Sequence, residues 1–138
     1  MAYCRWRGHG VRLLTESEWE RAAAGTGGHP FPWGDEPPAP ERLNFTPAAK
    51  SEQEKHKSLQ HATPVGFYPI GATEEGILDL AGNVFEWCTD EWTEHFRVVR
   101  GGCFASTALF VRSAFRGRYP PDRRADHIGF RVCRSTDW

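Results

Sequence analysis

The sequence predicts an α+β domain with one clear helix, a small twisted antiparallel sheet and long irregular loops. Three observations point to this class: a capped helical segment near the N-terminus, short alternating segments in the C-terminal half, and a content of 14 glycines and 10 prolines. A length of 138 residues suits one domain, so we expect residues 1–138 to form a single unit. Six tryptophans and nine phenylalanines supply large side chains for its core.

The helix is predicted where Thr15 and Glu18 form a capping box, in which each side chain can bond the backbone N–H of the other residue. Trp19, Ala22 and Ala23 then follow at helical spacing and give one apolar face. Gly25 is suited to end the helix. We expect a helix of about ten residues that packs on the body through Trp19.

Strands are predicted over 83–88, 97–104, 110–118 and 127–134, because apolar and β-branched residues alternate there with polar ones. Residues 63–68 also have β character, and 71–76 form a turn. The proline- and glycine-rich stretch 27–47 predicts turns, and the charged stretch 48–60 predicts an exposed loop.

Charge is distributed unevenly, although the net charge of −1 predicts no particular partner. Residues 97–134 carry nine arginines, no lysine and two aspartates. A nucleic-acid surface is one interpretation, but no basic recognition motif accompanies the arginines. We therefore expect no nucleic-acid partner, and expect these arginines to pair with acids of the other half of the domain.

The chain has no apolar run long enough to span a membrane and no signal-peptide pattern, so a cytoplasmic location is the default prediction. The four cysteines, Cys4, Cys88, Cys103 and Cys133, lack the paired spacing of a zinc site. We expect free buried thiols. A bridge between Cys103 and Cys133 is the alternative in an oxidising compartment.

Five motifs occur in order along the chain: RLLTESEWERAA at 12–23, FPWGD at 31–35, DLAGNVFEW at 79–87, VRGG at 99–102 and IGFRV at 128–132. Together they resemble the formylglycine-generating-enzyme/sulfatase-modifying-factor domain family, which has a C-type-lectin-like fold. Family domains usually carry a further segment before the part that resembles AYCRW at 2–6. By this resemblance, the chain looks like an N-terminally shortened copy of the domain.

The resemblance implies a structural calcium ion held by Asp79, Gly82, Val84 and Glu86, with Asn44 at part of a second site. Hard oxygen ligands gathered on one tight loop suit calcium chemically. In the alternative interpretation, Glu86 and Asn83 only hydrogen-bond the loop backbone.

The catalytic members of the family bind copper through two cysteines after the glycine pair, and the matching positions here are Ser106 and Val111. Without thiolates there is neither a soft copper site nor a nucleophile. Cys103 is expected to point away from Ser106. The six histidines show no metal-ligand spacing, so we expect no copper and no iron, and the sequence favours a domain without catalytic residues.

The segment 101–134 contains no Lys, Glu, Gln, Met or Trp. Codons made from AAC by replacing adenines encode none of these five residues. The pattern resembles the variable proteins of diversity-generating retroelements, many of which use this scaffold. The alternative is that strands generally contain little Glu, Lys and Gln, and that family motifs fill the remaining positions.

A non-catalytic ligand-binding module is therefore predicted, with its binding face in 103–127 and with a protein or other macromolecule as ligand. The candidate binding residues are Phe104, Ser106, Thr107, Leu109, Phe110, Phe115, Gly117, Tyr119, Asp126 and His127. An exposed sheet edge would also be compatible with a homo-oligomer. The alternative function is an oxidoreductase or accessory domain, of the formylglycine-generating-enzyme or sulfoxide-synthase type, that needs a partner domain.

Overall fold

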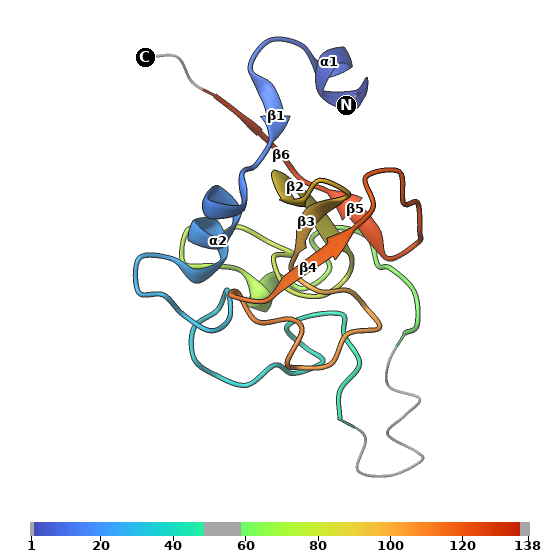
Figure 1. Cartoon of the computed structure of the whole chain (residues 1–138). Coiled ribbons are helices and arrows are strands. Elements are labelled where there is room, and N and C mark those ends of the chain that lie inside the picture. Colours follow the sequence, from blue (N-terminus) through green and yellow to red (C-terminus); the bar gives the residue numbers. More distant parts are fainter. Residues whose placement is uncertain (1, 49–58, 136–138) are drawn as a thin grey trace.

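The computed structural model describes residues 2–48 and 59–135, and the predicted loop over 48–60 lies mostly outside them. The described part has the predicted α+β class, with a small sheet flanked by a helix and long loops (Figure 1). The elements in order are α1 (Ala2–Arg7), β1 (Val11–Leu13), α2 (Glu16–Ala24), the 3-10 turn η1 (Pro69–Gly71), β2 (Phe85–Thr93), β3 (Phe96–Arg100), β4 (Arg116–Tyr119), β5 (Ile128–Phe130) and β6 (Val132–Arg134).

The larger sheet has the strand order β4-β3-β2-β5, and β1 pairs separately with β6. Strands β2, β3 and β4 are antiparallel, as predicted, but β5 runs parallel to β2. The prediction of an all-antiparallel sheet was therefore wrong. Residues 120–127 carry the chain from β4 at one edge of the sheet to the other edge, where β5 lies beside β2 and runs in the same direction.

Helix α2 forms where the capping box predicts it. The Oγ1 atom of Thr15 accepts a hydrogen bond from the Glu18 backbone N–H at 3.2 Å, and Glu18 accepts one from the Thr15 N–H at 2.8 Å. The helix ends at Gly25, whose φ of 62° is a conformation that glycine adopts readily. Trp19 is buried, so its predicted role as the packing residue of the helix is confirmed.

Helix α1 was not predicted, and four of the predicted strand segments need correction. The strand expected over 97–104 stops at Arg100, because Gly101 and Gly102 take positive φ values and turn the chain. The segment expected over 110–118 is strand only from Arg116, and residues 63–68 form no strand. The strand expected over 127–134 divides at Arg131 into β5 and β6, which belong to different sheets.

The two faces of the larger sheet have different neighbours. On one face Cys88 and Val98 pack with Trp19 of α2. On the other face Phe85 and Val99 form the centre of a second apolar cluster. A third cluster lies among the loops and contains Phe31, Leu43, Phe45, Ala81 and Val111. The loops are thus part of the hydrophobic core.

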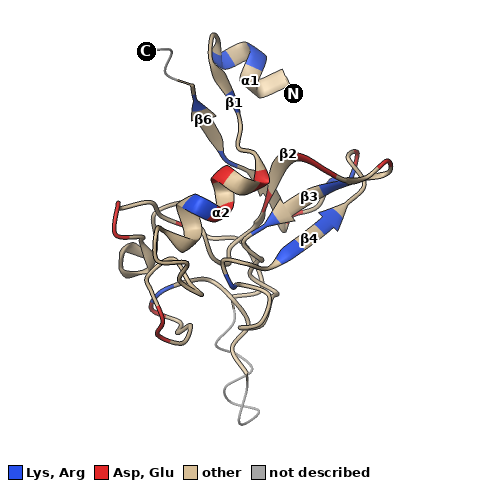
Figure 2. Cartoon of the chain, turned by 60° about the vertical axis from the view of Figure 1, so that its left-hand side comes forward, with Lys and Arg blue, Asp and Glu red and all other residues tan. Residues whose placement is uncertain are grey.

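Ion pairs join the basic C-terminal half to acids elsewhere in the domain, as the sequence predicted. The fully buried Arg100 contacts Glu16 at 2.6 Å and Glu20 at 2.7 Å, and Arg116 contacts Glu16 at 2.6 Å. Figure 2 shows the acidic first turn of α2 beside the basic residues of β3 and β4. Among the described residues, no helix is long and apolar enough to cross a membrane.

Candidate functional site

The sheet face that points away from α2 carries a continuous row of aromatic side chains. Adjacent ring centroids are 5.0 Å apart for Phe110 and Phe115, 6.5 Å for Phe115 and Phe85, and 6.0 Å for Phe85 and Tyr119. Tyr119 in turn lies 6.4 Å from Trp87 and 5.9 Å from His127. We call these six residues, Phe85, Trp87, Phe110, Phe115, Tyr119 and His127, the aromatic face.

The outer end of the aromatic face is open to solvent. Leu109 is 62% exposed and Phe110 is 40% exposed, and Thr107 beside them is exposed as well. Asp126 is exposed at the far end of the row, where its carboxylate lies 3.1 Å from the Nδ1 atom of His127. The structure therefore gathers these predicted binding residues on one surface.

The inner part of the face is half-buried. Phe115, Tyr119 and His127 are each partly covered, and the pKa of the Tyr119 hydroxyl is raised above its ordinary value because burial disfavours the phenolate. Phe115, expected on the exposed face, instead packs partly against the Phe85 cluster. Gly117 permits close packing, since a Cβ there would lie 3.0 Å from a methyl group of Val99.

Phe104 and Ser106 do not belong to this surface, because both are buried with a relative exposure of 6%. The prediction that they contact a ligand directly was wrong for this arrangement. The turn after Gly102 directs them inward, and the Ser106 N–H donates to the Cys103 carbonyl at 2.9 Å. The alternation of side chains along a strand ends at such a turn, so it does not predict the orientation of the residues that follow.

The same turn brings Cys103 and Ser106 together. The Cys103 N–H donates to the Ser106 hydroxyl at 3.0 Å, and the Cys103 Sγ atom lies 3.5 Å from the same oxygen. The prediction that Cys103 points away from Ser106 was therefore wrong. Val111, at the second position that matches a copper ligand, is fully buried among apolar side chains of the loops. Neither position offers a thiolate.

All four cysteines are free, so the alternative of a bridge between Cys103 and Cys133 is not realised here. Burial raises the pKa of Cys88 to about 12, and burial also raises the pKa of Cys133. Burial thus disfavours the thiolate form of both residues. Within residues 2–48 and 59–135, no three His, Cys, Asp or Glu side chains gather as a metal site would require.

The predicted calcium ligands lie close together in sequence, but their side chains already have partners. Both Glu86 oxygens accept hydrogen bonds from Arg131, at 2.9 and 3.0 Å, and Glu86 also accepts one from the Trp19 indole at 2.7 Å. Asp79 accepts the Gly66 N–H at 2.6 Å. Asp79, Val84 and Glu86 line one hollow together with Arg131, so a calcium ion there would compete with the Arg131 cation for the Glu86 oxygens.

Hydrogen bonds of Asn83 and Asn44 hold the loop around these residues in place. The Asn83 side chain accepts the Thr63 N–H at 2.8 Å and donates to the Thr63 carbonyl at 3.2 Å. The backbone carbonyl of Asn44 accepts the Asn83 N–H at 2.8 Å. A Cβ at Gly82 would lie 2.2 Å from that carbonyl, so only glycine fits there. Val84 is half-buried at the end of the loop.

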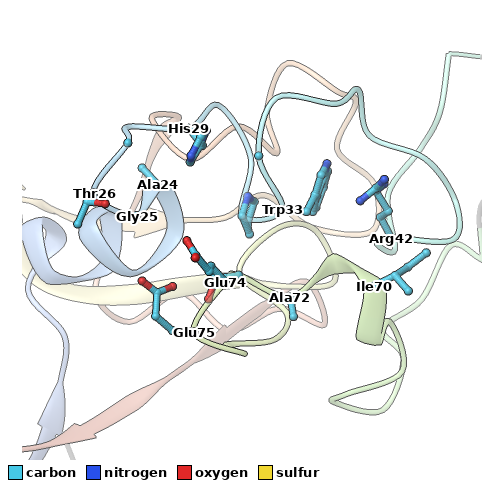
Figure 3. Close-up of a pocket in the computed structure, with 14 residues that line it drawn as sticks. Ala24, Gly25, Thr26, His29, Trp33, Arg42, Ile70, Ala72, Glu74 and Glu75 are labelled. Carbon is cyan, nitrogen blue, oxygen red and sulfur yellow. The ribbon is translucent and has the colours of Figure 1, made fainter.

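A separate hollow of about 420 Å³ lies between the C-terminal end of α2 and the loops. Figure 3 shows Trp33 and Arg42 towards one end and Glu74 and Glu75 towards the other, below Gly25. None of the residues 103–127 lines it, and no motif in the sequence indicated it.

The chain resembles proteins of one family in both sequence and structure. The model of the sulfatase-modifying factor enzyme 1-like domain matches residues 1–136. Inactive C-alpha-formylglycine-generating enzyme 2 of Bos taurus is 36% identical over 142 residues, which cover 96% of this chain and 46% of the relative. Formylglycine-generating enzyme of Streptomyces coelicolor is 34% identical over 164 residues, covering 99% of this chain and 50% of the relative.

Two solved structures share the fold. PvdO from Pseudomonas aeruginosa superposes with a TM-score of 0.80 at 28% identity, covering 98% of this chain and 58% of PvdO. Treponema denticola variable protein 1 superposes with a TM-score of 0.73 at 26% identity, covering 92% of this chain and 48% of that protein. The chain thus spans about half the length of the curated relatives it matches. It belongs to the sulfatase-modifying factor enzyme 1-like domain family.

Proposed function

We propose that this chain is a non-catalytic ligand-binding module whose ligand, a protein or other macromolecule, docks on the exposed end of the aromatic face. The observation that carries the proposal is the pair Ser106 and Val111, which stand where catalytic relatives are expected to hold copper. Both side chains are buried and neither is a thiolate. The scaffold is retained while the expected metal ligands are absent.

The aromatic face has the composition of a recognition surface. Leu109 and Phe110 are apolar and exposed, and Thr107 and Asp126 add polar groups at its two ends. Aromatic side chains supply much of the binding energy in protein interfaces, while the polar groups around them select the partner. Phe115 and Tyr119 support the exposed residues from below, because their rings are packed against the core.

The names of two similar proteins agree with a non-catalytic role. One is named as an inactive formylglycine-generating enzyme, and a structural neighbour is named as a variable protein. We therefore extend the proposal to a diversified surface, in which residues of 103–127 vary between copies while the glycines and arginines of the frame stay constant. The absence of Lys, Glu, Gln, Met and Trp from 101–134 is what motivates this extension.

The first test separates binding from catalysis. The purified chain is loaded with copper(I), its metal content is measured, and oxygen consumption is followed with a cysteine-containing peptide. We expect less than one copper per ten chains and no oxygen uptake above the metal-only control, at an order-of-magnitude level. Stoichiometric copper with peptide-dependent oxygen uptake would establish the alternative, an oxidoreductase of the formylglycine-generating type.

The second test addresses the surface. A phage library of random peptides is panned on the wild-type chain, and the selected peptides are then tested on the double variant Leu109→Ser/Phe110→Ser. We expect their affinity to fall by about tenfold or more, because two exposed apolar side chains are removed. Ile70→Ser is the matched control, since Ile70 is 58% exposed but lies outside the face. Peptides that bind all three proteins equally would show that the face is not the binding site.

The third test concerns diversification. The DNA around the gene is searched for a near-copy of the stretch that encodes residues 101–134, differing from it at adenines, and for a neighbouring reverse transcriptase. Finding both supports a variable protein. Finding neither would contradict the diversification hypothesis. The binding proposal would then depend on the peptide test alone.

A further inference from the structure

Strand β4 (Arg116–Tyr119) lies at one edge of the larger sheet, with β3 on its inner side. Because backbone groups alternate along a strand, the N–H and C=O of every second residue of β4 face away from β3. Within the described residues, no segment other than β3 is hydrogen-bonded to the backbone of β4. In both views the strand lies away from α1 and the start of the chain (Figure 1, Figure 2). The outer side of β4 is thus a free sheet edge.

The side chains of β4 leave this edge open. Edge strands are commonly protected by charged side chains that obstruct pairing. The two arginines of β4 instead lie over rings on the inner side of the strand. The guanidinium carbon of Arg116 is 4.4 Å from the ring centroid of Trp92 on β2, and that of Arg118 is 5.2 Å from the same ring. Arg118 also lies 5.6 Å from the ring centroid of Phe96 on β3. Neither charge therefore projects across the backbone edge.

Arg118 carries the uncompensated charge of this edge. Both carboxylate oxygens of Glu16 accept hydrogen bonds from Arg116, at 2.6 and 2.7 Å. Arg118 is exposed, and it has no ion pair with any described residue, including Asp122, the first acid after the strand. A guanidinium that stacks on a ring keeps its N–H groups available to a carboxylate. An acidic group beside Arg118 would therefore find an unoccupied partner.

We propose that β4 accepts an extended, acidic segment of a partner protein as an additional strand, with a carboxylate of that segment on Arg118. The inference rests on the proposed function, because it names the partner class and how the ligand is held. Tyr119 belongs to the aromatic face, so the added strand would direct alternate side chains towards that face. Pro120 follows β4 and has no N–H to donate, which limits the pairing to the 4 residues of the strand.

A second copy of this chain is the competing occupant, since free edges also pair with themselves. Side chains that lie directly opposite each other in an antiparallel pair share a face of the sheet. Two β4 strands paired in this way would place Arg116 or Arg118 of one copy opposite Arg118 of the other. Like charges at opposed positions destabilise the pairing, whereas an acidic segment has the complementary charge. The charges of β4 thus favour an acidic partner over a second copy.

The probe for this edge is a blocked hexapeptide, Glu-Val-Glu-Phe-Glu-Val, whose glutamates all lie on one face when it is extended. It is added to the purified chain up to about 1 mM while the amide NMR signals are followed. We expect the amide signals of β4 to shift, and the matched peptide with lysine in place of glutamate to leave them unchanged. Methylating every second backbone nitrogen of the peptide should weaken binding by about tenfold in one of the two alternating sets, because those N–H groups face β4.

Arg118→Gln and Arg118→Glu test the charge. The acidic peptide should bind about threefold more weakly to the first variant and about tenfold more weakly to the second, which should also gain affinity for the lysine peptide. Arg134→Glu is the matched control, because Arg134 is an exposed arginine on β6 that has no ion pair with a described residue. Circular dichroism should show that the Arg118 variants still fold, since this side chain is exposed.

Unchanged β4 signals at about 1 mM acidic peptide, or equal binding of the lysine or methylated peptides, would overturn the proposal. So would β4 signals that move when the chain alone is diluted, which would make a second copy the occupant. The double variant Leu109→Ser/Phe110→Ser separates this inference from the proposed function. Library peptides that lose affinity for this variant but shift no β4 signal retain the proposed function and overturn the added strand. An acidic peptide that shifts β4 and binds the variant equally well supports the added strand and contradicts the proposed docking site.

Discussion

The guanidinium of Arg131 holds the carboxylate of Glu86 through two parallel hydrogen bonds, of 2.9 and 3.0 Å. A third nitrogen-to-oxygen bond, of 2.7 Å, runs from Arg131 to the carbonyl of Leu78, and the indole of Trp19 donates to Glu86 at 2.7 Å. One charge pair thus connects the junction of β5 and β6 with β2, with the loop before β2 and with helix α2. Burial would lower the pKa of Arg131, but the attraction of Glu86 outweighs it and raises that pKa.

Replacing Arg131 with methionine should destabilise the fold by about 3 kcal/mol, because the buried Glu86 carboxylate would lose its cation. Urea unfolding followed by tryptophan fluorescence measures the change. Arg134→Met is the matched control: Arg134 is exposed on the next strand, and its loss should change the unfolding free energy by less than about 0.5 kcal/mol. Equal effects of the two substitutions would show that the pair with Glu86 contributes nothing specific.

Calcium removal should leave the thermal midpoint unchanged, because Glu86 is engaged by Arg131 and Trp19. The measurement is a thermal melt with a chelator and with about 1 mM calcium chloride. A ligand that binds only the folded chain raises the midpoint by linkage. A clear rise with calcium would therefore support the calcium site that the resemblance implies.

Acid should weaken the fold through the two carboxylates at the start of α2. A hydrogen bond from Arg12 lowers the pKa of Glu18 to about 2. Burial alone would raise the pKa of Glu16, but hydrogen bonds from Arg116 and Arg100 outweigh it and lower that pKa. Because both values are lowered on folding, the unfolded chain binds more protons, and the stabilisation is present above about pH 4.5 and is lost as the pH falls towards about 2.

Urea midpoints measured between about pH 6 and about pH 2 test whether stability falls on acidification. Glu18→Gln should flatten the lower part of the profile, where Glu18 takes up its proton. A midpoint that rises on acidification would contradict the assignment. Added salt should reduce the contribution of Glu18, because its side chain is 42% exposed.

The capping box of α2 should contribute about 1 kcal/mol through Thr15, since its hydroxyl satisfies a backbone N–H that has no partner inside the helix. Thr15→Ala measured by urea unfolding gives this value. Ser17→Ala, in the exposed first turn, is the comparison and should have little effect. If Thr15→Ala is as mild as Ser17→Ala, the cap is not a significant part of the stability.

Features that depend on near neighbours could be predicted from the sequence. Thr15 and Glu18 are three positions apart, so the start of α2 follows from local chemistry, and Gly25 marks its end for the same reason. Residue types at single positions were equally informative: the absence of cysteine at 106 and 111 needs no coordinates. The α+β class and the family resemblance were confirmed on this basis.

Only the tertiary structure decided the burial of Phe104 and Ser106, the parallel course of β5 and the partner of Glu86. Each depends on segments that lie far apart in the chain, such as the 45 positions between Glu86 and Arg131. Local patterns specify on which side of a strand each side chain lies. They do not specify where Gly101 and Gly102 turn the chain, or which residues then cover the side chains that follow the turn. The free energy of burial arises when such distant segments meet, and for that reason it is determined by the fold as a whole.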